Sequence, residues 1–373
     1  MFYDWLSCHQ DFDRLLPVVS DRLEVYLDTA SGDILHQRQP AVMVEGSHDT
    51  RVQIRVAGAR LSFSGNPSRW GRQDNLFGFT SLDDCFEVVN RAVAVVFSGC
   101  EWQPRFTRST KVWMGRGDNA QMVGDGVKIT RLDVTTNIET GKGNEYAYQR
   151  ALSNLPYRNS IPQFFSNGCT THWKTKSGKK SRLIDAKTYL KAEEIELHLL
   201  PRVIRKHGKG SSEAGYVERL INFCRERGTV RFEQSLRAEF LAREGLNFWG
   251  RFDEQRLVPI HTEFLNLDEK LKVTAMDIET IADRLIAENI CKSTQSANAT
   301  ASYAIRWMHG ETFDRGKSQV RTNRARLRAI GMDIYQKCDL TRHSPVFVTK
   351  VRQVNVRPLS VPSFYQKPVA RAA

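Results

Sequence analysis

The sequence of 373 residues lacks the patterns that mark exported and membrane proteins. It has no apolar run of membrane-spanning length and no long basic amphipathic helix, so we expect no association with a membrane. The first residues, MFYDWLSCHQDFDRLL, carry acids where a signal peptide needs a basic stretch and an apolar core. The chain also shows no internal repeat and no low-complexity block.

The cysteines show no pattern of a metal site or of paired disulfides. There are seven, an odd number, and no two of them are spaced as a CxxC pair. We therefore predict free thiols in a reducing cytoplasm, and neither a zinc site nor a disulfide framework. The seven are Cys8, Cys85, Cys100, Cys169, Cys224, Cys291 and Cys338.

An excess of positive charge is the main compositional feature. Lys and Arg total 55 against 42 Asp and Glu, which gives a formal net charge of +13. Such a charge favours a polyanionic partner, because Lys and Arg release counterions from a phosphate backbone. The hydrophobic content of 40% is enough to fill real cores, so the chain is expected to fold.

The first two thirds of the chain predict an α+β fold with a mainly antiparallel sheet. Residues 40–65 alternate apolar and polar side chains between Gly, Asn and Pro, a pattern typical of antiparallel strands. Similar patterns return at 126–139, at 170–190, where a Ser-Gly turn joins two basic arms, and at 229–238.

Helical spacing separates these strands. Residues 81–97 place apolar side chains on one side, with Ser81 as the N-cap. Residues 192–204 and 213–228 follow the same rule, and Gly228 is expected to end the second of these helices.

After about residue 265 the character of the sequence changes. Short helical patterns joined by polar loops predict a smaller helical domain over 266–350, and the Pro-rich segment 351–373 predicts an extended tail. The larger α+β domain would then occupy residues 1–265.

Tyr189 lies in the sequence KTYLK, between Lys187 and Lys191. In a strand, the two-residue period places all three side chains on one face. Nearby ammonium groups favour phenolate over phenol and neutralise phosphate charge, so this face suits attack on a DNA phosphate. The alternative is a packed strand tyrosine with its hydroxyl at the surface.

Acidic residues on two further strands could hold a divalent ion. Asp133 lies in RLDVTTNIE and Glu233 in VRFEQSLRAEF, and oxygen ligands from neighbouring strands suit Mg²⁺ or Mn²⁺. His172, on the strand before the tyrosine, is a candidate nitrogen ligand. The alternative is that Arg131–Asp133 and Arg231–Glu233 are cross-strand salt bridges.

A basic helix near the C-terminus is a candidate DNA-binding element. Thr322 is its expected N-cap and Gly331 its expected stop. Its arginines recur at helical spacing, which suits insertion into a DNA groove, whereas the alternative is an ordinary solvated face. Adding the basic arms of the hairpin gives the predicted DNA contacts Lys174, Arg182, Arg321, Arg324 and Arg328.

Several segments, in order, resemble the replication initiators of filamentous phages, the phage and plasmid gene II/X replication family. The similar segments are MFYDWLSCHQDF, LSFSGNPSRWGRQDNLFG, TRLDVTT, TYLKAEEIE, VRFEQSLRAEFL, ASYAIRWMHGETF and RTNRARLRAIGMDI. The resemblance covers nearly the whole chain, and it makes Tyr189 the counterpart of the family's nicking tyrosine.

The resemblance implies an initiator of rolling-circle replication that acts in the host bacterial cytoplasm. Such an enzyme binds the origin of the double-stranded replicative form and nicks one strand through a 5′-phosphotyrosyl link. It leaves a 3′-hydroxyl for the host polymerase, hands the nicked duplex to a host helicase and later rejoins the displaced strand. It needs a divalent metal, and it can act as an oligomer on the DNA.

The chain departs from the wider group of His-hydrophobic-His nickases. None of its nine histidines forms an H-x-H pair, so a metal would rest mainly on Asp133 and Glu233, with His172 as a third ligand. No second tyrosine accompanies Tyr189, so termination needs a second subunit, water or reuse of Tyr189. The competing hypothesis is a non-catalytic DNA-binding repressor or origin-binding protein built around the basic helix.

Overall fold

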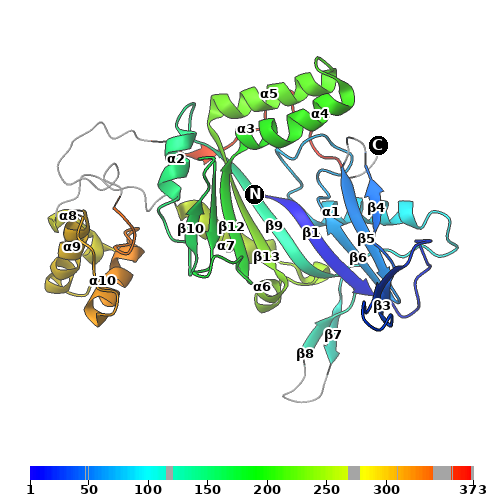
Figure 1. Ribbon diagram of the computed structural model, residues 1–373, viewed down its shortest axis with the longest axis horizontal. Helices are drawn as coiled ribbons and strands as arrows, with labels where there is room; N and C mark the ends of the chain where they lie inside the picture. The colour runs from blue at the N-terminus through cyan, green and yellow to red at the C-terminus, as the bar shows by residue number, and fades with distance from the viewer. Residues whose placement is uncertain are drawn as a thin grey trace.

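One large antiparallel sheet forms the centre of the molecule (Figure 1). The computed structural model describes residues 1–46, 48, 50–114, 121–267, 278–308, 310–338, 354 and 356–370. The strand order is β10-β11-β12-β13-β9-β1-β6-β5-β4, and β14 pairs with the end of β9. Together with the helices packed around it, this sheet confirms the predicted α+β class.

The longest strands lie in the middle of the sheet, where both faces are covered. Buried residues occupy nearly the whole of β13 and most of β9. The strands are β1 (Phe2–Asp11), β4 (Val42–Glu45), β5 (Arg51–Ala57), β6 (Arg60–Gly65), β9 (Lys128–Glu139), β10 (Ile161–Phe164), β11 (Thr170–Lys174), β12 (Ile184–Leu190), β13 (Thr229–Arg237) and β14 (Arg357–Pro358). Two separate hairpins pair β2 (Glu24–Leu27) with β3 (Ile34–Arg38), and β7 (Lys111–Met114) with β8 (Gln121–Gly124).

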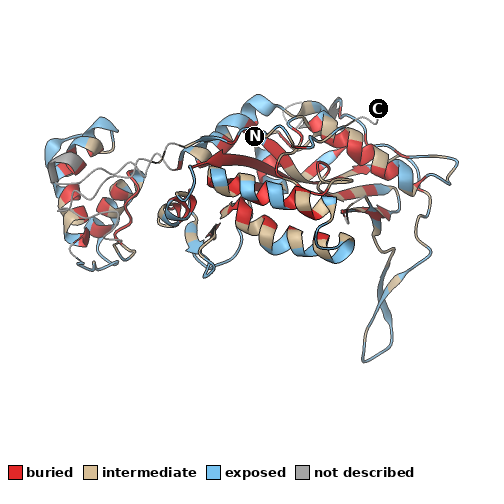
Figure 2. Cartoon of the chain, turned by 90° about the horizontal axis from the view of Figure 1, so that it is seen from above, coloured by how far each residue is buried: buried red, intermediate tan, exposed pale blue. Residues whose placement is uncertain are grey.

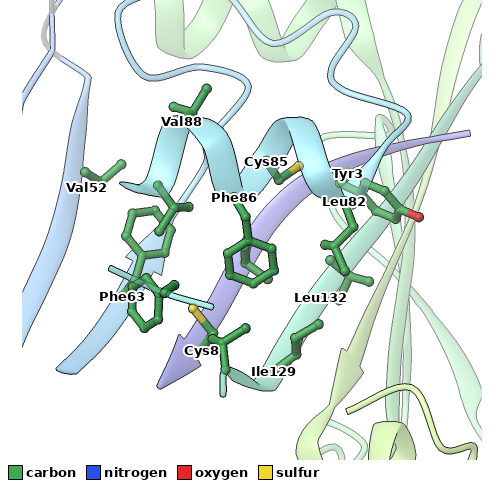
Figure 3. Close-up of a cluster of buried hydrophobic side chains, with 14 of the residues drawn as sticks. Tyr3, Cys8, Val52, Phe63, Leu82, Cys85, Phe86, Val88, Ile129 and Leu132 are labelled. Atoms are coloured by element: carbon green, nitrogen blue, oxygen red, sulfur yellow. The ribbon is translucent and has the colours of Figure 1, made fainter. Parts of the chain in front are cut away.

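One face of the sheet is apolar and carries most of the helices. Helix α1 (Leu82–Val96) places Leu82, Cys85 and Phe86 against β1 and β9 (Figure 3). Its N-cap is Ser81, as predicted, and the Ser81 side chain accepts a hydrogen bond from the backbone N–H of Asp83. The other helices on this face are α2 (Glu145–Leu152), α6 (Ala238–Arg243) and α7 (Glu254–Leu265), all of which contact β13.

A second group of helices covers one end of the opposite, polar face. It comprises α3 (Lys191–Glu194), the π-helical turn η3 (Ile195–Leu199), α4 (Leu200–His207) and α5 (Ser212–Arg227). Gly228 adopts a left-handed conformation with φ of 59° and ends α5, as its position in the sequence predicts. The buried residues of α5 recur at helical spacing, and Figure 2 shows helices that carry both buried and exposed residues, the pattern of amphipathic helices on a core.

Three helices near the C-terminus form a unit with its own core. They are α8 (Ile278–Ala287), α9 (Thr294–Met308) and α10 (Ser318–Ala329). Side chains from all three enclose buried residues such as Leu285, Ala301 and Leu327. The helical character predicted for this region is therefore confirmed, whereas the boundaries at 265 and 350 stay predictions.

The C-terminal tail is extended, and it packs against the large domain. Strand β14 pairs with β9, and the Tyr365 hydroxyl donates to the carbonyl of Phe77 at 2.9 Å. The same hydroxyl accepts from Arg72 Nη2 at 2.8 Å. The tail therefore completes the cluster beneath α5. Within the residues that the structure describes, no helix combines the length and apolarity needed to cross a bilayer.

A candidate nicking site on the polar face of the sheet

Charged side chains meet on the polar face of the three strands β12, β13 and β9. Antiparallel pairing sets Lys187 opposite Glu233, and Glu233 opposite Thr135. Residues directly opposite one another point to the same side of a sheet, so alternate residues of each strand share this face. The alternation predicted for β9 is thereby confirmed.

Tyr189 lies on this face and hydrogen-bonds to an acid of the next strand. Its hydroxyl donates to Glu233 Oε2 at 3.1 Å. The other oxygen of Glu233 lies 2.9 Å from Lys187 Nζ, and that ammonium also sits 5.2 Å from the centre of the Tyr189 ring. One carboxylate therefore joins the phenol to a cation, and the three groups form a compact unit.

The electrostatics of Tyr189 differ from the prediction made from its lysine neighbours. Burial raises the pKa of the Tyr189 phenol well above its usual value, and the Glu233 carboxylate raises it further, against an opposing effect of Arg231. The phenol is therefore protonated at neutral pH. The expectation that ammonium groups favour phenolate here is wrong, and an attack by this oxygen needs a base.

Lys187 keeps its charge in this unit. Burial acts to lower its pKa, but the Glu233 carboxylate more than offsets that effect, so the pKa of Lys187 is raised. An ammonium that stays protonated can neutralise phosphate charge and can give a proton to a leaving oxygen. Of the two predicted lysines, this is the one that faces the tyrosine.

Lys191 does not continue the face of Tyr189. Strand β12 ends at Leu190, and Lys191 is the first residue of α3, so the two-residue alternation stops before it. Its side chain is 1% exposed, with Nζ 2.9 Å from Asn75 Oδ1 and 2.6 Å from Glu194 Oε2. The cation that acts on the Tyr189 phenol from the central strands is instead Arg231.

Neither of the expected cross-strand salt bridges has the predicted form. Arg131 holds Asp133 through two hydrogen bonds, of 2.8 and 2.5 Å, but the two residues belong to one strand. Arg231 does not bind Glu233. It donates instead to Asn137 Oδ1 at 2.8 Å and to the carbonyls of Asn75 and Leu76 at 2.6 and 2.9 Å.

The candidate metal ligands already have partners. Burial raises the pKa of Asp133 to about 6, although Arg131 acts to lower it. His172 Nε2, on β11, lies 2.7 Å from Oδ1 of Asp185 on β12, which is the strand of Tyr189. Within the described residues, no three His, Cys, Asp or Glu side chains lie close enough together to hold a metal ion. Asp133, Glu233 and His172 therefore do not form a ready-made ligand set.

Several residues around Tyr189 were not predicted from the sequence. Asp4 lies where the pairing of β1 shifts between Tyr3 and Trp5, and it raises the pKa of the Tyr189 phenol. Its Oδ1 accepts from the amides of Asn66 and Asn75, at 2.7 and 3.0 Å. Both asparagines lie in the segment LSFSGNPSRWGRQDNLFG, which resembles the phage initiators. That resemblance could have identified them.

The basic helix α10 differs from the prediction at its start. Lys317 is the N-cap, and Thr322 lies inside the helix, where its hydroxyl donates to the Ser318 carbonyl at 3.1 Å. Gly331, with φ of 88°, follows the end of the helix as predicted. The helical spacing of the arginines located the helix, but the choice of Thr322 as the capping residue placed its N-cap five residues too late.

Some of the side chains predicted to contact DNA already bind other residues of the protein, whereas others are exposed. Arg324 donates to both oxygens of Asp333 at 2.6 Å and lies 4.1 Å from the Tyr335 ring centre. Arg328 Nε is 3.9 Å from the same carboxylate, whereas Arg321 is exposed. On the hairpin, the Arg182 side chain is 90% exposed. Lys174, at the end of β11, lies over the Phe165 ring.

Comparison with known proteins assigns the chain to a family. The family model for the N-terminal part of the gene II replication-associated protein matches residues 2–255, and the model for the C-terminal part matches residues 285–371. The replication-associated protein of Escherichia phage If1 is 44% identical over 320 residues, which is 85% of this chain and 98% of the relative. No solved structure matches the chain. The chain therefore belongs to the family of filamentous phage gene II replication-associated proteins.

Proposed function

We propose that this replication protein initiates rolling-circle synthesis by nicking one strand of the origin with Tyr189. The observation that carries the proposal is the hydrogen bond from the Tyr189 hydroxyl to Glu233, with Lys187 bound to the same carboxylate. A nucleophile, a base in hydrogen-bond contact and a cation are the groups that a phosphoryl transfer needs.

The proton balance of the reaction follows from these three groups. As the phenol oxygen of Tyr189 forms its bond to phosphorus, its proton passes to Glu233. The bond from phosphorus to the 3′ oxygen breaks, and that oxygen takes a proton from Lys187. Glu233 then returns its proton to Lys187 across their 2.9 Å contact, so the pair is restored. The products are a 5′-phosphotyrosyl link and a 3′-hydroxyl.

Cations on the polar face would stabilise the charge that develops on the phosphate. The pKa of Lys187 is raised, so its ammonium stays protonated. The charge of the buried Arg231 acts on the phenol of Tyr189. Fixed positive groups stabilise such charge because they need not reorganise when the charge develops. Rejoining the displaced strand is the same transfer in reverse, with a 3′-hydroxyl attacking the phosphotyrosyl link.

The expected Mg²⁺ or Mn²⁺ is part of the proposal, but no step above passes through it. An ion bound to Asp133 or Glu233 would have to compete with Arg131 or Lys187 for the carboxylate. When bound, such an ion would polarise the phosphoryl oxygens under attack. Origin duplex, host helicase and polymerase, and other copies of the chain on the DNA are the proposed partners.

The test is covalent capture of the origin strand. Full-length protein is incubated with supercoiled origin DNA or with an end-labelled origin strand, and an adduct that survives denaturation is mapped by peptide sequencing. The adduct should lie on Tyr189, and Tyr189→Phe should abolish both nicking and adduct while origin binding stays intact.

The control is Tyr26→Phe, because Tyr26 is exposed on the separate β2–β3 hairpin. This variant should nick as the unaltered protein does. Nicking by Tyr189→Phe at the unaltered rate would refute Tyr189 as the nucleophile. A metal-independent footprint with no adduct from any variant would support the alternative, a non-catalytic origin-binding protein.

A further inference from the structure

A basic pocket lies beside the candidate site, on residues that the nicking reaction does not use. Its volume is about 330 Å³. One wall comes from the loop after β6 and the other from α3, η3 and α4. The lining residues are Arg69, Asn75, Glu194, His198, Leu199 and Arg202.

The charges of this pocket leave two arginines available to a ligand. Glu194 lies 2.6 Å from the buried Lys191, and its pKa is lowered to about 2, so this acid is ionised and already neutralised. Among the described residues, no acid lies within ion-pair distance of Arg69 or Arg202, although the charge of Arg69 helps to lower the pKa of Glu194. The Nε of Arg69 is enclosed and has no hydrogen-bond acceptor, which is a costly state for a buried donor.

The backbone of the second wall departs from an α-helix at the pocket itself. Pro201 has no N–H to donate, and its ring crowds the carbonyl of the residue four positions earlier. The helix responds with the π turn η3, in which the N–H of Leu200 bonds to the carbonyl of Ile195. His198 lies in this turn and Arg202 one residue after Pro201, so the irregular turn carries two of the basic lining residues.

Asn75 connects this pocket to the tyrosine. Its side-chain oxygen accepts from Lys191, and its amide donates to Asp4. Its backbone carbonyl accepts from Arg231. Asp4, Arg231 and the pocket residue Glu194 all act on the pKa of the Tyr189 phenol, so the pocket adjoins the surroundings of that hydroxyl.

We propose that this pocket binds a backbone phosphate of the nicked strand, next to the phosphate that Tyr189 attacks. The proposal rests on the proposed function. Arg69 and Arg202 would hold the phosphate oxygens through charge-assisted hydrogen bonds from their guanidinium groups. The pocket thereby fixes the position of the strand relative to Tyr189, and its residues are positioning residues.

The test uses Tyr189→Phe protein and a tiled set of single-stranded origin oligonucleotides, each with one neutral methylphosphonate in place of a phosphate. Equilibrium binding should weaken about tenfold at one or two positions, because a charge-assisted contact is lost. Adding Arg69→Gln and Arg202→Gln should weaken binding of the unmodified strand to a similar extent. In that variant the same methylphosphonate should cause no further loss.

The matched control is Arg205→Gln, an exposed arginine of the same helix that does not line the pocket. It should leave the methylphosphonate penalties unchanged, and thermal unfolding should show that all variants are folded. Equal methylphosphonate penalties with and without the two pocket arginines would refute the pocket.

The pocket and the nicking reaction fail separately in these assays. If the methylphosphonate penalty does not depend on Arg69 and Arg202 while Tyr189 still forms an adduct, only the pocket proposal is overturned. If the methylphosphonate penalty does depend on these two arginines but the protein never forms an adduct, only the proposed nicking reaction is overturned.

Discussion

Replacing Glu233 with Gln tests the proton transfer at the centre of the candidate site. Glu233 is 4% exposed and binds both the Tyr189 hydroxyl and the Lys187 ammonium. Gln keeps the shape of the side chain but cannot take the phenol proton. Because burial and Glu233 both raise the pKa of the Tyr189 phenol, little phenolate forms without a base. General-base catalysis contributes about 10²- to 10⁴-fold, so the nicking rate should fall by about that factor.

Glu233→Gln should lower the stability of the fold only modestly. Lys187 loses its partner, but its side chain is 38% exposed and water replaces part of the lost interaction. We expect the free energy of unfolding to fall by about 1–2 kcal/mol, less than for a fully buried pair. Burial would then lower the pKa of Lys187, because the carboxylate that offsets this effect is gone.

The assay is single-turnover nicking of origin DNA at saturating protein, with denaturant unfolding measured in parallel. Glu226→Gln is the matched control, because Glu226 is an exposed acid paired with Lys142 at the surface. Its nicking rate should be unchanged. A rate for Glu233→Gln within about threefold of the unaltered protein would show that the phenol proton goes elsewhere.

Three further predictions concern Asp133, the metal and the helical unit. The pKa of Asp133 is raised from 3.8 to about 6, so the folded state binds the extra proton between those values and stability should fall as pH rises from about 4 to 6. Asp133→Asn should remove up to about 3 kcal/mol of this dependence, measured by denaturant unfolding across pH, and an unchanged slope would assign it to other groups. EDTA should stop adduct formation and Mg²⁺ or Mn²⁺ should restore it, whereas an adduct formed equally in EDTA would exclude the metal requirement. Arg324→Ala should lower the stability of the helical unit by about 1–2 kcal/mol, because Asp333 loses its partner, while Arg321→Ala should leave unfolding unchanged and lower the salt slope of DNA binding by about 1. Equal effects of the two substitutions on unfolding would contradict this division of roles.

The sequence predicted which of the candidate residues share a face better than it predicted their hydrogen-bond partners. Two-residue alternation predicted that Tyr189 and Lys187 share one face of their strand. It also predicted that Glu233 and Phe232 point to opposite faces of theirs, because this period is a local property of a strand. Tyr189 and Glu233 are 44 positions apart in the sequence, and their contact depends on the register of β12 against β13. No local sequence pattern predicts that register.

The errors at Lys191 and Thr322 have a common physical cause. Leu190 precedes α3 with no side-chain cap, and Lys317 precedes α10 in the same way. Sequence reasoning places helix starts at capping residues, so it misses helices whose first turn is stabilised by tertiary contacts instead. Lys191 illustrates this, because its buried ammonium binds Asn75 and Glu194.

The tail strand β14 changes how the helical unit α8–α10 can move. Because residues 356–370 pack against the large domain, the chain leaves that domain after residue 267 and returns to it once the helical unit is complete. A unit that is joined to the large domain at both ends has a smaller range of positions than a unit joined at one end only. Eleven Cα–Cα steps separate residue 267 from residue 278, so these two residues can lie at most about 40 Å apart. DNA bound by the helical unit would therefore stay within a limited distance of the sheet.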